Sequence, residues 1–254
     1  MSFTKELHQR NPLLSVVGWV YISFAGILLM CMPLVSVEVL GIHALIKPTK
    51  FLISSTVLVW TAAWLMHYLS AQRIVRIYSW IMVLVMSFEN IYITWQAWLG
   101  QLSHFNGSSD FHRMMFTLMG WAIGIMTGST IIIGIQFYRK LRVELPAAYL
   151  WGIRLGLLLF VIFAFEGYGM GAINAHTVGA PDGGEGLPFV NWSTEHGDLR
   201  IAHFLGMHAL QILPLAGYYV FKKPLGIILF ALVYLVGVSA VMVQAIMGIP
   251  LIAG

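Results

Sequence analysis

Six polar side chains that lie in or beside apolar segments are of types that bind ligands or transfer protons. They are Glu89, His112, Glu166, His203, His208 and Gln211. Neutral imidazoles bind haem iron and other transition metals, and carboxylates complete such sites or carry protons. We therefore predict catalytic roles for the two acids and the glutamine, and cofactor-binding roles for the three histidines.

The segment Glu195–Gly217, EHGDLRIAHFLGMHALQILPLAG, holds the densest group of these residues at the point where a polar loop enters an apolar helix. His203 and His208 are five residues apart and so differ by about 140° around a helix axis, with Gln211 between them in angle. Two ligands to one ion on one helix usually lie three or four residues apart. A metal site that uses both histidines and Glu166 therefore needs side chains from more than one helix.

Depth along the chain indicates which of these residues can meet. Glu166 comes late in one predicted span and His203 early in the next, so both belong to the same half of the membrane. His112 opens a span on that side as well. In another predicted span Glu89 shares one helical stripe with Tyr92 and Gln96, because these residues lie three and seven positions further on. An interhelical hydrogen-bond seam and a functional site both explain that stripe.

Composition places the chain in a membrane. Of 254 residues, 59% are hydrophobic and only 9% charged, too few to cover a soluble globule. The net charge of +4 comes from small cationic groups beside apolar runs, a pattern typical of membrane topology, and we expect no nucleic-acid partner. The single cysteine, Cys31, excludes an intramolecular disulfide and a cysteine-based metal cluster.

Seven apolar runs have the length of about 20 residues needed to cross ~30 Å of hydrocarbon. They cover approximately residues 13–34, 51–70, 77–99, 114–138, 147–171, 200–221 and 225–251. Nine Lys and Arg residues flank one set of ends and four flank the other, so the positive-inside rule predicts a cytoplasmic N-terminus and an external C-terminus. We predict an all-α integral membrane protein, a bundle of about seven helices forming a single transmembrane domain over residues 1–254.

Other features have structural interpretations. Arg154 lies close to the inner end of its span and is expected to reach the interface, and Asp198 is a plausible helix cap. Glycines at four-residue spacing predict close helix packing. These are Gly120, Gly124 and Gly128 in one span, and Gly152 and Gly156 in the next.

Three functions fit these patterns. The first is an oxidoreductase that depends on haem or a transition metal and takes electrons from a quinol, the reduced form of a quinone, or from another donor on the outer side. The second is a proton- or cation-coupled transporter or channel-like protein, since acids within a membrane suit that role. The third is an accessory subunit of a membrane complex. The partners expected are the lipid bilayer, a quinone or small polar ligand, and a second copy of the chain or a membrane complex.

Two short motifs carry a resemblance. SHFN at Ser103–Asn106, combined with GDLRIAHFLGMHALQ at Gly197–Gln211, resembles a group of bacterial multi-pass membrane proteins that have no assigned activity. The resemblance covers mainly the outer loops and the sixth span. It implies a bacterial inner membrane and transfers no catalytic residue.

Overall fold

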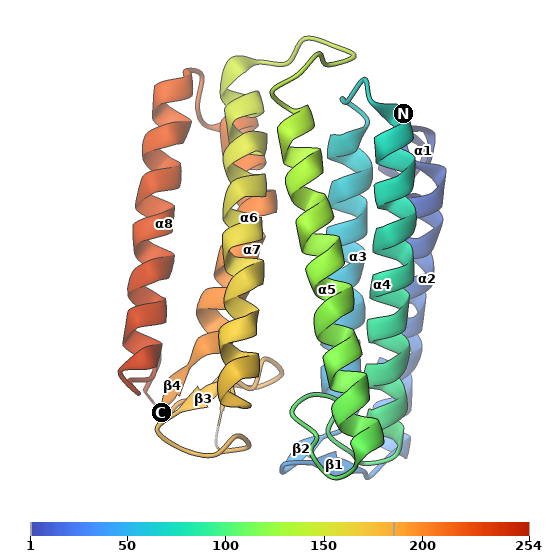
Figure 1. The fold of residues 1–254 in the computed structure, drawn as a ribbon, viewed down its shortest axis with the longest axis vertical. Coiled ribbons are helices and arrows are strands. Elements are labelled where there is room, and N and C mark those ends of the chain that lie inside the picture. Colours follow the sequence, from blue (N-terminus) through green and yellow to red (C-terminus); the bar gives the residue numbers. More distant parts are fainter. Residues whose placement is uncertain (1, 185, 254) are drawn as a thin grey trace. The chain divides into compact units, whose positions relative to one another are not determined.

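A computed structural model describes residues 2–184 and 186–253. In this part of the chain seven helices are long and apolar enough to cross a bilayer (Figure 1). They are α2 (Pro12–Cys31), α3 (Ile46–Met66), α4 (Gln72–Trp98), α5 (Asp110–Gln136), α6 (Ala147–Ile173), α7 (Leu199–Tyr219) and α8 (Pro224–Ile246). The predicted all-α fold with seven spans is confirmed.

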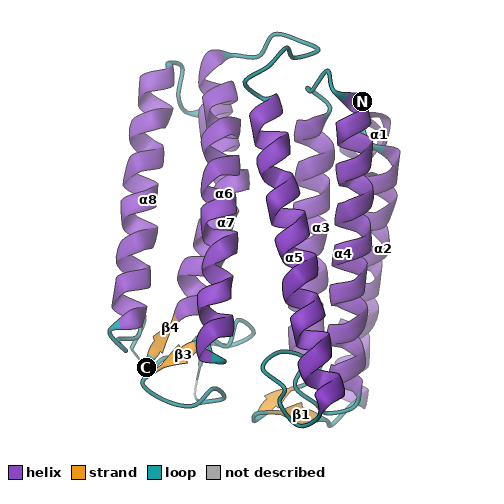
Figure 2. Ribbon diagram, in the orientation of Figure 1, coloured by secondary structure: helices purple, strands orange, loops and turns teal. Residues whose placement is uncertain are grey.

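Non-membrane elements are short. A helix, α1 (Phe3–Arg10), precedes α2, and a single 3-10 turn, η1 (Met32–Leu34), follows it. The strands form two antiparallel pairs at helix ends (Figure 2). These pairs are β1 (Glu38–Val39) with β2 (Ile42–His43), and β3 (Thr177–Val178) with β4 (Gly197–Asp198).

Several helices begin earlier than hydropathy predicts. α3 starts at Ile46 instead of residue 51, and α4 at Gln72 instead of residue 77. Lys47 and Pro48 fit the first turn of α3, because backbone N–H groups there have no partner within the helix and a proline loses nothing. Hydropathy reports the thickness of the hydrocarbon, whereas helical hydrogen bonding continues into the polar interface.

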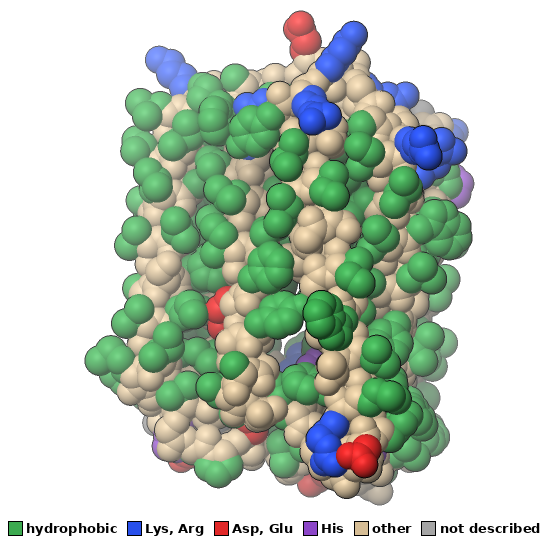
Figure 3. Space-filling model, viewed as in Figure 1, with side chains coloured by type: hydrophobic (Ala, Val, Ile, Leu, Met, Phe, Trp, Pro, Cys, Tyr) green, Lys and Arg blue, Asp and Glu red, His purple; other side chains and the backbone are tan. Residues whose placement is uncertain are grey.

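Apolar side chains cover the length of the helices, whereas Lys and Arg gather at helix ends (Figure 3). Large hydrophobic residues such as Trp121, Val233 and Tyr219 are about 70% exposed on this surface. Such exposure would be costly in water and is expected against lipid tails. The protein is therefore a multi-pass membrane protein that is surrounded by a lipid bilayer.

The chain divides into two compact units, one up to Met126 and one from Thr127. α1 to α4 and the first part of α5 belong to the first unit, and the rest of α5 with α6 to α8 belongs to the second. The connections between α2 and α3, between α4 and α5 and between α6 and α7 are the longer ones, as predicted for the outer side.

In the first unit the β1–β2 hairpin closes the outer connection between α2 and α3. Leu40 and Gly41 take positive φ angles of 54° and 72°, the geometry of a two-residue turn that matches strand twist. His43 fixes the hairpin, because its Nε2 lies 3.0 Å from the Met32 carbonyl oxygen and its Nδ1 accepts the Leu45 N–H at 3.2 Å. Both nitrogens of this outer histidine are thus used structurally.

In the second unit α6 and α7 pack backbone to backbone. A Cβ added at Gly152 would overlap the Leu213 carbonyl oxygen, and one at Gly156 would lie 2.8 Å from the Ala209 carbonyl oxygen. Gly217 on α7 meets α6 in the same way. The predicted packing role of Gly152 and Gly156 is confirmed, and the absence of side chains allows this close approach.

The α5 glycines differ. Within the described chain, a Cβ at Gly120 or Gly128 would have no other atom within 4 Å, so the predicted tight seam is not found at either position. Four-residue spacing permits close packing but does not require a partner helix to use it.

Arg154 has the structural role predicted for it. Its guanidinium donates two hydrogen bonds to the Phe137 carbonyl oxygen, at 3.1 Å from Nε and 2.8 Å from Nη2. It also lies over the Tyr138 ring, 4.4 Å from the centroid. A cation that satisfies a carbonyl just beyond the end of α5 stabilises that helix terminus.

The helix seam generates a first prediction. Gly152→Ala should force α6 and α7 apart and destabilise the protein by about 1–3 kcal/mol, because the added methyl group overlaps backbone. Thermal unfolding in detergent should show a melting temperature lower by several degrees. Gly169→Ala is the matched control, since it lies on the same helix and its Cβ would have no atom within 4 Å. Equal melting temperatures for the two variants would contradict the seam.

Candidate functional site

The six predicted site residues are divided between the two units. Glu89 on α4 and His112 on α5 belong to the first unit, whereas α6 and α7 of the second unit carry the other four. Those four are Glu166, His203, His208 and Gln211.

Glu166 and His203 contact each other in the second unit. The His203 Nδ1 lies 3.1 Å from the Glu166 Oε2, and the two side chains are 24% and 6% exposed. Gly167 makes room for the ring, because a Cβ there would lie 3.0 Å from His203 Cε1. An ionised carboxylate can only accept a hydrogen bond, so Nδ1 is the donor. The carboxylate thus orients the ring through Nδ1, and Nε2 is the ring nitrogen that this contact does not use.

His208 also has a polar side-chain partner, about one and a half turns closer to the helix centre. Its Nδ1 lies 3.1 Å from the Gln211 Oε1, and its ring packs edge-on against Phe204 at a centroid distance of 4.3 Å. Trp192 of the outer loop contacts Phe204 in turn, at 5.5 Å. Pro214 cannot donate a backbone hydrogen bond to the carbonyl of Leu210, which lies between His208 and Gln211 in the sequence.

The two α7 histidines have different partners, so their contacts do not converge on one point. Within residues 2–184 and 186–253, no group of three or more His, Cys, Asp or Glu side chains is placed to hold a metal ion. Of the predicted metal set, the contact that the structure provides is the one between Glu166 and His203. Helix geometry predicts the angles on α7, whereas the contact of His203 with Glu166 also depends on the rotation of α6; His208 contacts Gln211 of its own helix.

The α4 stripe in the first unit is buried and only partly paired. Glu89 is 2% exposed and Gln96 0% exposed. Neither Glu89 Oε1 nor the two amide atoms of Gln96 has a hydrogen-bond partner among the described residues. Tyr92, between them on the stripe, has its hydroxyl oxygen 3.3 Å from His112 Nδ1.

The hydrogen bond between α4 and α3 comes from a different face of α4. Asn90 Nδ2 donates to the Ser55 Oγ at 2.8 Å, and Asn90 lies about 100° from Glu89 around the helix. The interhelical seam is therefore made by Asn90, and the Glu89 and Gln96 groups named above take no part in it.

Sequence reasoning overlooked the connection between Lys47 and His104. The Lys47 Nζ lies 3.4 Å from His104 Nδ1, which is also 3.1 Å from the Ser103 Oγ. The SHFN motif contains His104, but nothing in the sequence indicated that the His104 side chain would contact the first turn of α3.

The outer loop of the second unit is closed at its base by Asp198. This side chain is 1% exposed and accepts hydrogen bonds from the Ser193 N–H at 2.9 Å and the Arg200 N–H at 3.0 Å. The Arg200 guanidinium pairs with the same carboxylate and also donates to the Asn191 carbonyl oxygen. The predicted capping role of Asp198 is confirmed, with the addition that the cap also holds the loop.

Asp182 organises the other end of this loop. Its Oδ1 accepts from the Thr177 N–H at 2.9 Å and lies 3.0 Å from the His176 Nδ1. Burial alone would raise the pKa of the Asp182 carboxyl, but the His176 and Thr177 contacts outweigh it and hold the pKa well below its usual range.

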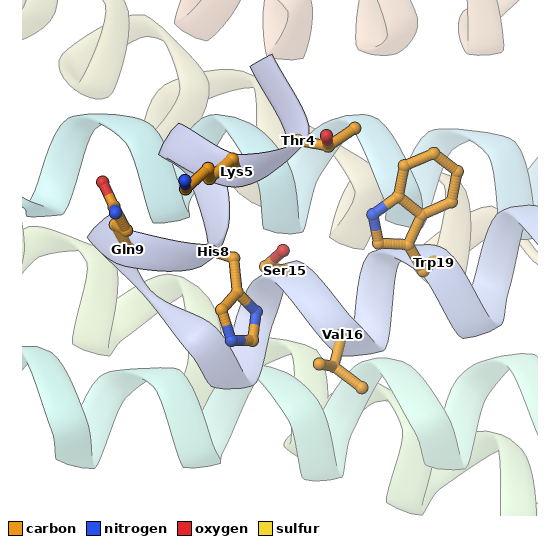
Figure 4. Close-up of a pocket in the computed structure, with 7 residues that line it drawn as sticks. All are labelled: Thr4, Lys5, His8, Gln9, Ser15, Val16 and Trp19. Carbon is orange, nitrogen blue, oxygen red and sulfur yellow. The ribbon is translucent and has the colours of Figure 1, made fainter. Parts of the chain in front are cut away.

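A cavity of about 430 Å³ lies between α1 and the start of α2, at the inner end of the first unit (Figure 4). Its lining includes Lys5, His8, Val16 and Trp19 and none of the six predicted site residues. Because most of these lining residues are exposed, the cavity is an open groove on the surface of the first unit.

Comparisons with protein-family models, curated proteins and solved structures found no match to this chain. Its function is therefore inferred from the geometry of its own residues.

Asp182 generates a pH-dependent prediction. The folded pKa lies below the unfolded value of about 3.9, so the stabilisation is complete above that value and is lost as pH falls through the folded pKa. Asp182→Asn should lower the melting temperature at pH 7, and its difference from the unmodified protein should shrink below about pH 4.

Asp110→Asn is the control, because Asp110 is almost fully exposed and its ion pair with Arg113 is expected to contribute little. A melting-temperature difference for Asp182→Asn that stays constant between pH 7 and pH 3 would show that the carboxylate charge is not what stabilises the loop.

Proposed function

We propose that the protein is a haem-dependent redox protein of the bacterial inner membrane, with His203 as an iron ligand on the outer side. The observation that supports this most directly is the orientation of the His203 imidazole, whose Nδ1 is 3.1 Å from the Glu166 carboxylate. A histidine that binds a metal usually donates its other N–H to a carboxylate or carbonyl, which fixes the ring and increases the basicity of the ligating nitrogen. The outer location follows from the positive-inside rule, and the bacterial origin from the resemblance.

The donor set favours haem over a bare metal ion. A transition-metal ion held by protein alone usually needs three or four side-chain ligands. Haem iron receives four nitrogens from the porphyrin and needs only one or two from the protein. Isolated, oriented imidazoles therefore suit haem better than a chelated ion. His208, whose Nδ1 lies 3.1 Å from the neutral Gln211 amide oxygen, is the second candidate ligand.

The electron donor that fits this location is a quinol or a small molecule from the outer side. Phe204, between the two α7 histidines in sequence, is 38% exposed and offers an aromatic surface for a quinone ring. Electron transfer to the inner side would need a cofactor at the other depth. We expect a second copy of the chain or another membrane subunit to receive the electron.

Absorption spectroscopy with iron analysis tests this proposal. Protein purified from haem-supplemented cells should show a Soret band and bound iron, and His203→Ala should lose both. His8→Ala, on exposed α1, should retain them. Glu166→Gln should keep the haem but raise the reduction potential of the haem. The neutral amide oxygen still accepts the hydrogen bond from Nδ1–H, but it lacks the negative charge that makes the imidazole more basic. No Soret band and no bound iron in the unmodified protein would rule the proposal out.

A proton- or cation-coupled transporter is the second candidate, and Glu89 favours it. A carboxyl group within a span, 2% exposed, is energetically costly and is typical of ion or proton pathways. Proteoliposomes with a pH-sensitive dye inside would detect proton entry under an imposed membrane potential. Entry that is lost in Glu89→Gln but kept in His203→Ala would favour transport over redox chemistry.

A further inference from the structure

The buried polar groups of α4 form a line from the outer end of the helix toward its middle. Gln96 lies two residues before the end of α4 at Trp98, and Glu89 lies nine residues before it. At 1.5 Å per residue these positions are about 3 Å and 13.5 Å from the helix end. Tyr92 lies between them on the same stripe and is 2% exposed. The stripe therefore connects the outer interface with the middle of the membrane.

Gln96 indicates the chemistry of what occupies this line. Its Nε2 is a donor and its Oε1 an acceptor, and both are buried without a partner among the described residues. A metal cation can use the oxygen but not the N–H, and an apolar ligand can use neither. Water donates and accepts, and buried polar groups that lack a protein partner are commonly satisfied by it.

Ionisable groups from the neighbouring elements face this stripe. They are His112 on α5, which contacts Tyr92, and Lys47 on α3, which contacts His104. The Tyr92 hydroxyl and His112 can each donate and accept a hydrogen bond. They lie between Gln96 and Glu89 along α4, where a relay needs such groups.

We propose that Glu89 is a proton-binding site, reached from the outer side through water molecules held along α4 by Gln96 and by the Tyr92–His112 pair. In the binding step a hydronium ion on this path transfers its proton to the Glu89 carboxylate, which forms the carboxylic acid and leaves one water molecule. The site is separate from Glu166 and His203, and it does not depend on haem.

Infrared spectroscopy of the protein in lipid tests this directly. The carboxylic-acid C=O band of Glu89, identified by its loss in Glu89→Gln, should appear as the outer pH is lowered. On transfer to D₂O that band should shift rapidly in the unmodified protein. Gln96→Met keeps the side-chain volume but removes both polar atoms, and it should slow the shift by about tenfold or more.

Two further variants make the result decisive. Tyr92→Phe removes only the hydroxyl and should also slow the exchange, so the path stays testable even if Gln96→Met does not fold. Gln101→Met, in the exposed loop beyond α4, is the matched control and should exchange as fast as the unmodified protein. Exchange at unchanged rate in both Gln96→Met and Tyr92→Phe would overturn the path, and the absence of any titrating band at Glu89 would overturn the proton site.

Discussion

The backbone contact between α6 and α7 determines the arrangement of polar groups in the second unit. Gly152 and Gly156 remove the side chains that would separate the two helices, and the close approach fixes both their rotation and their relative height. Glu166, further along α6, then meets His203 on α7. Lipid tails are as apolar as the helix surfaces, so the hydrophobic effect does not drive helices together within the bilayer. Close packing is therefore a main source of helix association. The histidine–carboxylate contact is thus a consequence of glycine positions more than one helical turn away.

Glu166 in the second unit and Glu89 in the first differ in their hydrogen-bond partners. Glu166 is paired with an imidazole, so its position is fixed by a contact within the protein. Glu89 has a carboxyl oxygen without a protein partner, and the Gln96 amide above it on the stripe is also unpaired. A paired acid is suited to orienting another group, whereas an unpaired one needs solvent or a proton. This contrast supports separate roles for the two acids.

Much of the fold could be predicted because span length and charge bias are properties of local sequence. The seven helices and the Asp198 cap follow from such local rules. Partners could not be predicted in the same way. Helical geometry gives the angle between His203 and His208, but it does not say which helix faces each side chain. Spacing alone could therefore not determine whether these two histidines and Glu166 form one metal site. The early start of α3 was likewise hidden from hydropathy, because Lys47 and Lys50 belong to the helix but not to the hydrocarbon.

Gly197 has a consequence for the order in which the second unit is completed. A Cβ at this position would overlap the Ala245 carbonyl oxygen, so β4 lies directly against the end of α8. The loop before α7 and α7 itself are synthesised before α8, yet the base of the loop has this neighbour only after the last helix has been inserted. The base of this loop can therefore reach its final packing only once α8 is in place.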